Sequence, residues 1–145
     1  MTRDNLQKRM MNKPLNCVFC SENESVQHLL FDCLVAKMVW KEVSSFLAKP
    51  VGTNMESVSS YWIAGKRLDV FNTIVAATLW ALWKHRNSLV FNGVVWLSLK
   101  QIWSLILRTI RRWRLIFKKH MLEQTDLFCQ RLQTMVQEPE LLEWG

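Results

Sequence analysis

Hydrophobic side chains recur every three or four positions over most of the chain, which is the period of an amphipathic α-helix. The first clear run spans residues 35–47 and predicts a helix of about fourteen residues that ends at Lys49-Pro50, because proline disfavours a helical conformation in the residue before it. Residues 51–54 are expected to be a linker. A short helix should follow over residues 55–64, with Gly65 as its C-terminal cap.

A second apolar run predicts a helix over residues 70–91, capped at its start by Asp69 and stopped by the Asn-Gly pair that follows it. His85 falls near the centre of its apolar face. A histidine in that position is typical of a satisfied core residue rather than of a ligand or a base. We expect the neighbouring Lys84 and Arg86 to be solvated flanks of this face.

A third helix is predicted from residue 99 to about residue 122. Ser98 and Gln101 have the spacing of a capping box at its start. One stripe of this helix is apolar and contains Leu99, Ile102, Trp103, Ile106, Ile110, Trp113, Phe117 and Met121. The opposite side carries the cations Lys100, Arg108, Arg111, Arg112, Lys118 and Lys119. Further apolar residues lie outside the stripe, namely Leu105, Leu107, Leu115 and Ile116.

The helical pattern continues beyond this stripe and stops by Pro139. It predicts either one very long helix or two helices that are broken near residues 123–125. Cys129 falls within this pattern, far from the other cysteines, and is expected to be a buried or free thiol.

The composition agrees with an all-α domain. A chain of 145 residues is expected to form one domain, and its four glycines and three prolines are too few for a turn-rich β architecture. We therefore predict four to six helices with little or no sheet. Eight tryptophans are hard to bury in one small core, so some exposed aromatic surface is expected as well.

The formal net charge of +7 suits a nucleic acid, an anionic membrane surface or an acidic protein partner, and does not choose between them. Residues 1–16 have no apolar segment of the kind found in secretory signals, and they weakly resemble an organelle presequence. The most apolar run, residues 70–83, is too short to span a bilayer. We expect an intracellular location in the cytoplasm or nucleus, with the mitochondrion as an alternative.

Three of the four cysteines and one histidine lie close together in the sequence, with the spacing C-x2-C-x7-H-x4-C. Two cysteines separated by two residues can share one metal ion, and a histidine and a third cysteine complete a closed, tetrahedral Cys3His site for structural zinc. The predicted ligands are Cys17, Cys20, His28 and Cys33. A redox pair is a poor alternative because no βαβ pattern surrounds the motif. The remaining alternative is a group of buried cysteines beside an unrelated histidine.

This segment has few large apolar residues, so zinc would supply folding energy that the segment otherwise lacks. Structural zinc contributes about 10–16 kcal/mol of apparent binding energy in small modules. Ser25 is placed to cap a short helix that begins at Val26 and carries His28 in its first turn.

The same residues resemble the zinc-binding module that follows the reverse transcriptase in plant non-LTR (LINE-type) retrotransposons. The matching positions are Cys17, Cys20, Glu24, His28, Leu29, Phe31, Cys33, Val39 and Trp40. A second block, LWALWKHRNSLVFNG, is similar to the tract that follows in those elements, a helix that ends in Trp-Lys-x-Arg-Asn-x-x-x-Phe. The chain contains no reverse transcriptase Tyr-x-Asp-Asp, endonuclease region or ribonuclease H carboxylate set. The resemblance therefore implies a free-standing piece of a polyprotein's non-catalytic tail, a candidate for domestication by its host.

We expect four parts along the chain. Residues 1–13 form a basic tail, and residues 14–49 form the zinc knuckle with its docking helix. Residues 50–138 form a helical bundle region that contains a long basic amphipathic helix over residues 98–122, and residues 139–145 form a C-terminal tail.

Nothing in the sequence predicts catalysis, since there is no nucleophile–base–acid set and no phosphate-binding glycine loop. The leading hypothesis is a factor that binds a cellular protein, with harm to the host cell as one consequence, and self-association stays open. The second is sequence-independent binding of nucleic acid through Arg108, Arg111, Arg112, Lys118 and Lys119. The third is direct membrane activity of the basic helix. The plain alternative for that helix is a core helix with a solvated outer face.

Overall fold

The computed structural model describes residues 16–63 and 69–138. A π-helical turn, His28–Asp32, is followed by the α-helices α2 (Leu34–Leu47), α3 (Met55–Ile63), α4 (Asp69–Phe91) and α5 (Leu99–Trp113), a 3-10 turn (Arg114–Ile116), and α6 (Lys119–Gln137). Within these residues there is no β-strand, only an isolated bridge between Asn16 and Asn23. The predicted all-α fold is confirmed. The predicted basic tail (1–13), the Gly65 cap and the C-terminal tail (139–145) lie outside the described residues.

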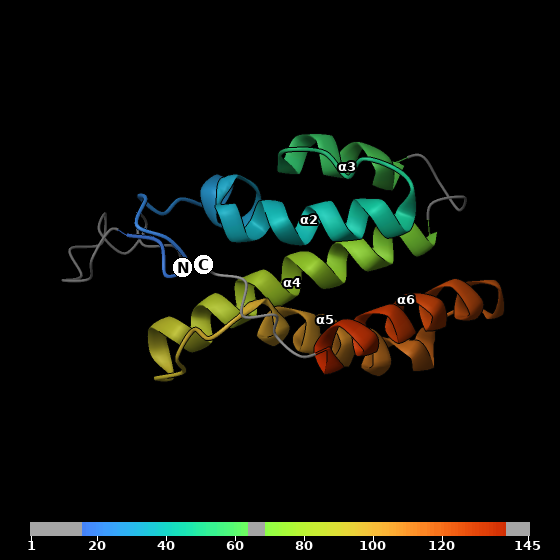
Figure 1. Cartoon of the computed structure of the whole chain (residues 1–145). Helices are drawn as coiled ribbons and strands as arrows, with labels where there is room; N and C mark the ends of the chain where they lie inside the picture. The colour runs from blue at the N-terminus through green and yellow to red at the C-terminus, as the bar shows by residue number, and fades with distance from the viewer. Residues whose placement is uncertain (1–15, 64–68, 139–145) are drawn as a thin grey trace.

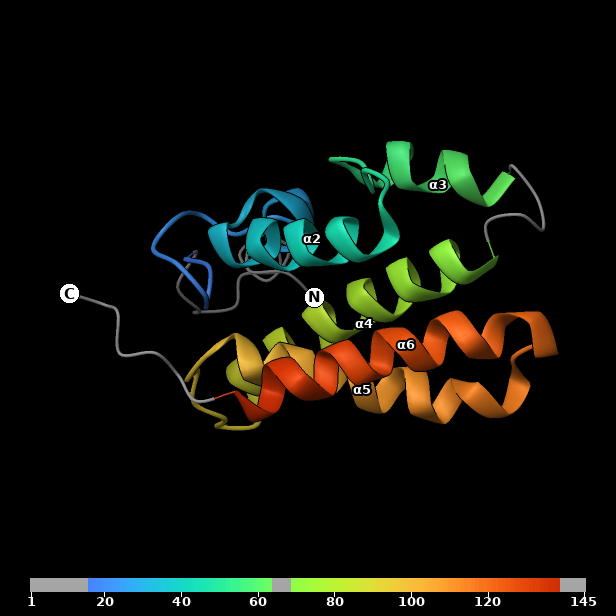
Figure 2. The same ribbon diagram turned by 45° about the vertical axis from the view of Figure 1, so that its right-hand side comes forward.

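Helix α4 lies in the middle of the bundle (Figure 1). The two helices α2 and α3 lie along one side of it, and α5 and α6 lie along the other (Figure 2). One hydrophobic core joins these parts, from the cysteine loop through α2, α4 and α5 to α6. No helix in the described ranges has the length and apolar character needed to cross a membrane.

The ends of the first two long helices lie where the sequence predicts them. Helix α2 ends at Leu47, and Ala48 takes a left-handed conformation (φ 53°) that closes the helix just before Pro50. Helix α4 ends at Phe91, followed by Gly93 with φ 67°. Glycine adopts this conformation without steric cost, so the Asn-Gly pair stops the helix as predicted.

The sequence pattern predicts either one very long helix or a break near residues 123–125, but the structure has its break elsewhere. Helix α5 ends at Trp113 and α6 begins at Lys119. His120 lies 3.5 Å from the Asp69 carboxylate, so this turn lies beside the start of α4. A helix continuing straight past Trp113 would leave the bundle, whereas a turn brings Met121 back to the core, where it is buried. The spacing of apolar residues does not reveal such a reversal, because the apolar side chains after the turn still face the same core.

Candidate metal centre

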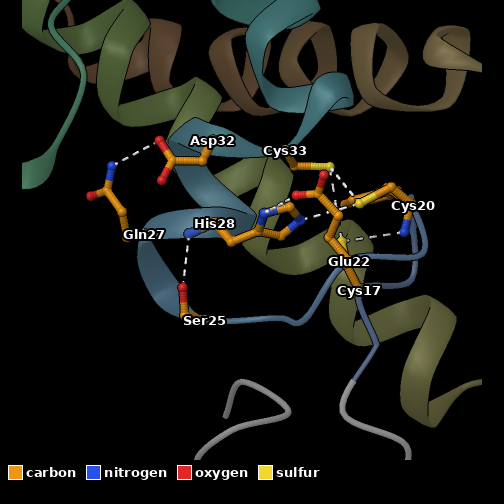
Figure 3. A network of polar contacts seen from close by, with 9 residues as sticks. Cys17, Cys20, Glu22, Ser25, Gln27, His28, Asp32 and Cys33 are labelled. Atoms are coloured by element: carbon orange, nitrogen blue, oxygen red, sulfur yellow. Dashed lines mark hydrogen bonds and ion pairs between the residues drawn. The ribbon is translucent and has the colours of Figure 1, made fainter.

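The four predicted ligands lie together at the end of the bundle where the chain enters α2. Cys17 and Cys20 come from the first loop, His28 from the π-helical turn, and Cys33 from the residue before α2. Their side chains converge (Figure 3). One donor atom from each residue lies within 4.8 Å of the others. The Cys33 Sγ lies 3.9 Å from the Cys17 Sγ and 3.8 Å from the Cys20 Sγ, and the Cys20 Sγ lies 3.2 Å from the His28 Nε2.

These separations fit one tetrahedral zinc ion. Zn–S bonds of about 2.3 Å and Zn–N bonds of about 2.0–2.1 Å place two sulfur ligands about 3.8 Å apart, and a sulfur and a nitrogen about 3.5 Å apart. The two sulfur–sulfur distances above agree with this value within about 0.1 Å, and the sulfur–nitrogen distance is about 0.3 Å shorter. Three thiolates and one imidazole are also the donor set that structural zinc prefers.

Backbone hydrogen bonds hold the ligands in place. The Cys17 N–H donates to the Glu22 carbonyl at 2.7 Å and so closes the first loop. The His28 N–H donates to the Ser25 Oγ at 3.0 Å, which confirms the predicted cap. The Cys33 N–H donates to the His28 carbonyl at 2.7 Å, a bond that spans five residues. The helical turn after the cap is therefore π rather than α, and it brings His28 and Cys33 together.

The thiols differ in acidity because one of them accepts a hydrogen bond from another. The pKa of Cys33 is lowered, chiefly because its sulfur accepts from Cys17 and also because the first amides of α2 face it. The pKa of Cys17 is raised well above its usual value by donating that hydrogen bond and by burial. Burial also raises the pKa of Cys20. Metal binding must therefore displace protons from at least two thiols, Cys17 and Cys20.

A carboxylate lies behind the imidazole. The Glu22 Oε2 is 3.7 Å from the His28 Nδ1, on the opposite side of the ring from the Nε2 that faces Cys20 (Figure 3). A carboxylate in this position favours a proton on Nδ1 and leaves Nε2 free as a ligand. Because the Glu22 side chain is 78% exposed, we expect a modest effect on metal affinity.

A buried ion pair ties the cysteine loop to helix α4, and it overturns one prediction. Arg86 was expected to be a solvated flank, but its side chain and that of Glu24 are both 0% exposed. The Arg86 Nη2 donates to one carboxylate oxygen of Glu24 at 2.7 Å, and its Nε donates to the other at 3.3 Å. The pair thus joins the cysteine loop to a helix that lies 62 residues further along the chain.

The π-helical turn also docks on α2, as predicted. The Trp40 Nε1 donates to the Leu30 carbonyl at 2.6 Å, and the Trp40 ring stacks on Phe31 at a centroid distance of 5.8 Å. The apolar residues beside the ligands thus belong to the main core, so the position of the candidate metal site is coupled to the packing of the bundle.

Two further predictions concern single buried residues. Cys129 is a buried free thiol, as expected. His85 is buried and stacks on Phe19, but its Nε2 has no hydrogen-bond partner, so the predicted satisfied histidine is only partly correct. Burial lowers the pKa of His85 and favours its neutral form.

The five cations proposed to bind anions are all exposed, but they do not form the face of one helix. Arg108, Arg111 and Arg112 lie on α5, whereas Lys118 and Lys119 lie at the start of α6, beyond the turn. Arg111 donates to the Gln133 Oε1 at 2.8 Å. Arg108 and Arg112 line a groove between α4 and α5. The prediction of one basic stripe on a single helix is wrong, because the chain reverses direction between Trp113 and Lys119, within the predicted stripe.

The fold and the cluster define a class: an all-α module with a Cys3His cluster whose geometry fits a zinc ion. Residues 1–40 match the family model described as "zinc-binding in reverse transcriptase". The resemblance of the cysteine segment to that module is therefore confirmed, and the match covers all four candidate ligands. The likeness of the second block, residues 79–93, to the following tract lies outside the matched segment and stays a prediction. Neither the curated proteins nor the solved structures contain a match to this chain.

Proposed function

We propose that the chain is a non-enzymatic binding module in which one structural Zn²⁺ ion, held by Cys17, Cys20, His28 and Cys33, fixes the N-terminal loop on the helical body, which binds a cellular protein. The observation that carries the zinc assignment is the convergence of three sulfurs and one imidazole nitrogen within 4.8 Å of one another. The match of residues 1–40 to a zinc-binding family supports the same assignment.

A structural role follows from the number and burial of the donors. Four protein ligands complete the tetrahedron that zinc prefers and leave no position for a reactive water molecule. Cys17, His28 and Cys33 are buried, and Cys17 and Cys33 belong to the hydrophobic core. The ion would thus join the loop, the π-helical turn and the start of α2, and would add to the packing of Leu29, Phe31 and Trp40 in the core.

The proposed protein-binding surface is the turn between α5 and α6. Leu115 and Ile116 are 92% and 82% exposed there, far more than apolar side chains of their size usually are in a helical bundle. The exposed cations Arg112 and Lys119 flank them. A partner with an apolar pocket and an acidic rim would complement both features. Occupation of an essential partner in this way would harm the host cell.

The zinc assignment is tested by metal analysis of the purified chain. We expect one zinc per chain in the wild type and in the Cys129→Ser variant, which removes a cysteine far from the cluster in sequence. We expect less than one zinc per chain in Cys33→Ser. Equal metal content in all three proteins would refute the assignment.

The partner hypothesis is tested by affinity capture from host cells, with nuclease present, using the wild type and the double variant Leu115→Asp/Ile116→Asp. A matched control is Leu127→Asp on α6, where the leucine is 50% exposed but lies outside the turn. We expect a specific salt-tolerant partner that the double variant loses and the control keeps. If the double variant still captures the partner, this surface is not the protein-binding site. The same conclusion follows if the only effect of the double variant is a loss of leakage from anionic vesicles.

A further inference from the structure

Helices α4 and α5 line a groove. It encloses about 770 Å³, and Trp80 and Lys84 of α4 face Arg108 and Arg112 of α5 across it. His85 also lines the groove. The groove uses none of the four candidate zinc ligands and neither apolar residue of the α5–α6 turn.

The groove is strongly basic. Three of its lining residues, Lys84, Arg108 and Arg112, are exposed cations, and no Asp or Glu lines it. Within the described part of the chain, none of the three forms an ion pair. Arg108 and Arg112 are four residues apart on one face of a helix, where like charges repel each other. Charge complementarity therefore calls for an anion that contacts several cations at once.

An aromatic ring accompanies these charges. Trp80 is 49% exposed although it lies in the middle of a helix that is otherwise buried along much of its length. An exposed indole beside cations is the arrangement that binds unpaired bases, in which the ring stacks on a base and the cations contact the phosphates. A base within a duplex cannot stack in this way, because its faces are covered by its neighbours.

The inner wall of the groove carries a polar atom that the protein leaves without a partner. His85 is 7% exposed, and its Nε2 makes no hydrogen bond. Gln101 and Ser104 add further polar groups to the lining.

We propose that this groove binds single-stranded nucleic acid, with the phosphates on Lys84, Arg108 and Arg112 and one base on Trp80. The site differs from the predicted five-residue basic face, since Lys118 and Lys119 do not line it and Lys84 and Trp80 do. It is a binding activity in addition to the proposed protein contact, and it needs neither Leu115 nor Ile116.

The test is fluorescence anisotropy of the zinc-loaded chain with a labelled oligothymidylate and with a duplex of equal length, over a range of salt concentrations. Trp80→Ala should weaken single-strand binding about 5- to 150-fold, the range for the loss of one stacked base. Arg108→Ala/Arg112→Ala should reduce the slope of log K against log salt by about 1.4, since each phosphate contact in a single strand contributes about 0.7. The matched control is Lys37→Ala/Lys41→Ala, which removes two exposed cations from α2.

The control variant should bind like the wild type, and the wild type should prefer the single strand. Equal weakening by the control would show that net charge alone attracts the oligonucleotide, and would overturn the proposal. Equal binding of the duplex, or an unchanged affinity in Trp80→Ala, would also overturn it. All the substituted side chains are exposed, so each variant should keep the wild-type circular dichroism. The uncharged variant Leu115→Ser/Ile116→Ser, which also removes the apolar surface of the turn, should keep its oligonucleotide affinity, which separates this proposal from the protein contact.

Discussion

The Glu24–Arg86 pair offers a sharp test of how the cysteine loop is held on the bundle. Neither side chain is exposed, and the guanidinium donates to both carboxylate oxygens, at 2.7 and 3.3 Å. Removing one partner takes away the opposite charge of a buried ion pair, which costs about 3–5 kcal/mol. A domain of this size is stable by about 5–15 kcal/mol, so either Glu24→Leu or Arg86→Met should remove a large part of the free energy of unfolding.

The double variant Glu24→Leu/Arg86→Met separates the pair from its surroundings. Replacing both charges with apolar side chains leaves no buried charge at either position, so the double variant should lose less free energy of unfolding than either single variant. Its loss should therefore lie several kcal/mol below the sum of the two single losses, which is about 6–10 kcal/mol. The assay is urea denaturation of the zinc-saturated proteins, followed by circular dichroism. It yields the free energy of unfolding and its slope with urea for each variant.

A half-exposed ion pair elsewhere in the fold provides the control. Arg131 donates to the Glu42 carboxylate at 3.0 Å, and both side chains are 40% exposed. Because water screens such a pair, Glu42→Gln should cost about 0–1 kcal/mol. If Glu24→Leu and Arg86→Met cost no more than Glu42→Gln, or if the two single losses simply add, the buried pair does not hold the loop and the reasoning is refuted.

Three further predictions follow from local geometry. Zinc affinity should fall on acidification, about hundredfold per pH unit while two thiols must lose protons, as measured by competition with a chromophoric chelator; a pH-independent affinity would contradict thiolate ligands. Gly52→Ala should lower the thermal unfolding temperature more than Gly93→Ala does. Both glycines have positive φ, but a Cβ at Gly52 would lie 2.6 Å from the Ser57 Oγ, whereas a Cβ at Gly93 would meet open space. Equal losses would contradict this prediction. Trp40→Phe should cost about 1 kcal/mol in urea denaturation, since the Leu30 carbonyl loses its 2.6 Å hydrogen bond, and an unchanged stability would count against the docking on α2.

Features encoded by neighbouring residues could be predicted from the sequence. The four candidate ligands lie within seventeen residues, so their spacing alone indicates that they can converge. The end of α4 is set by the Asn-Gly pair and the start of α5 by Ser98, whose Oγ accepts from the Lys100 N–H at 3.3 Å. The predicted capping box is only partly correct, because the Gln101 Oε1 accepts from the Leu97 N–H and not from Ser98. Such signals act within one or two turns, and the described fold agrees with them.

Features that depend on distant contacts could not be predicted in this way. Glu24 and Arg86 are 62 residues apart, and a single sequence shows each only as a charged residue between polar neighbours. The reversal after Trp113 has no proline or glycine to mark it, and the apolar spacing runs through it unchanged. The groove beside Trp80 likewise exists only because α5 packs against α4.

The central claim is that one zinc ion organises the amino-terminal loop through four side chains. Native mass spectrometry of the chain, purified without chelators, tests this claim most directly. We predict a mass that includes one zinc ion per folded chain, with loss of the ion and of cooperative unfolding when a strong chelator is added. A chain that carries no metal and still shows the same helical content and the same cooperative unfolding would contradict the account.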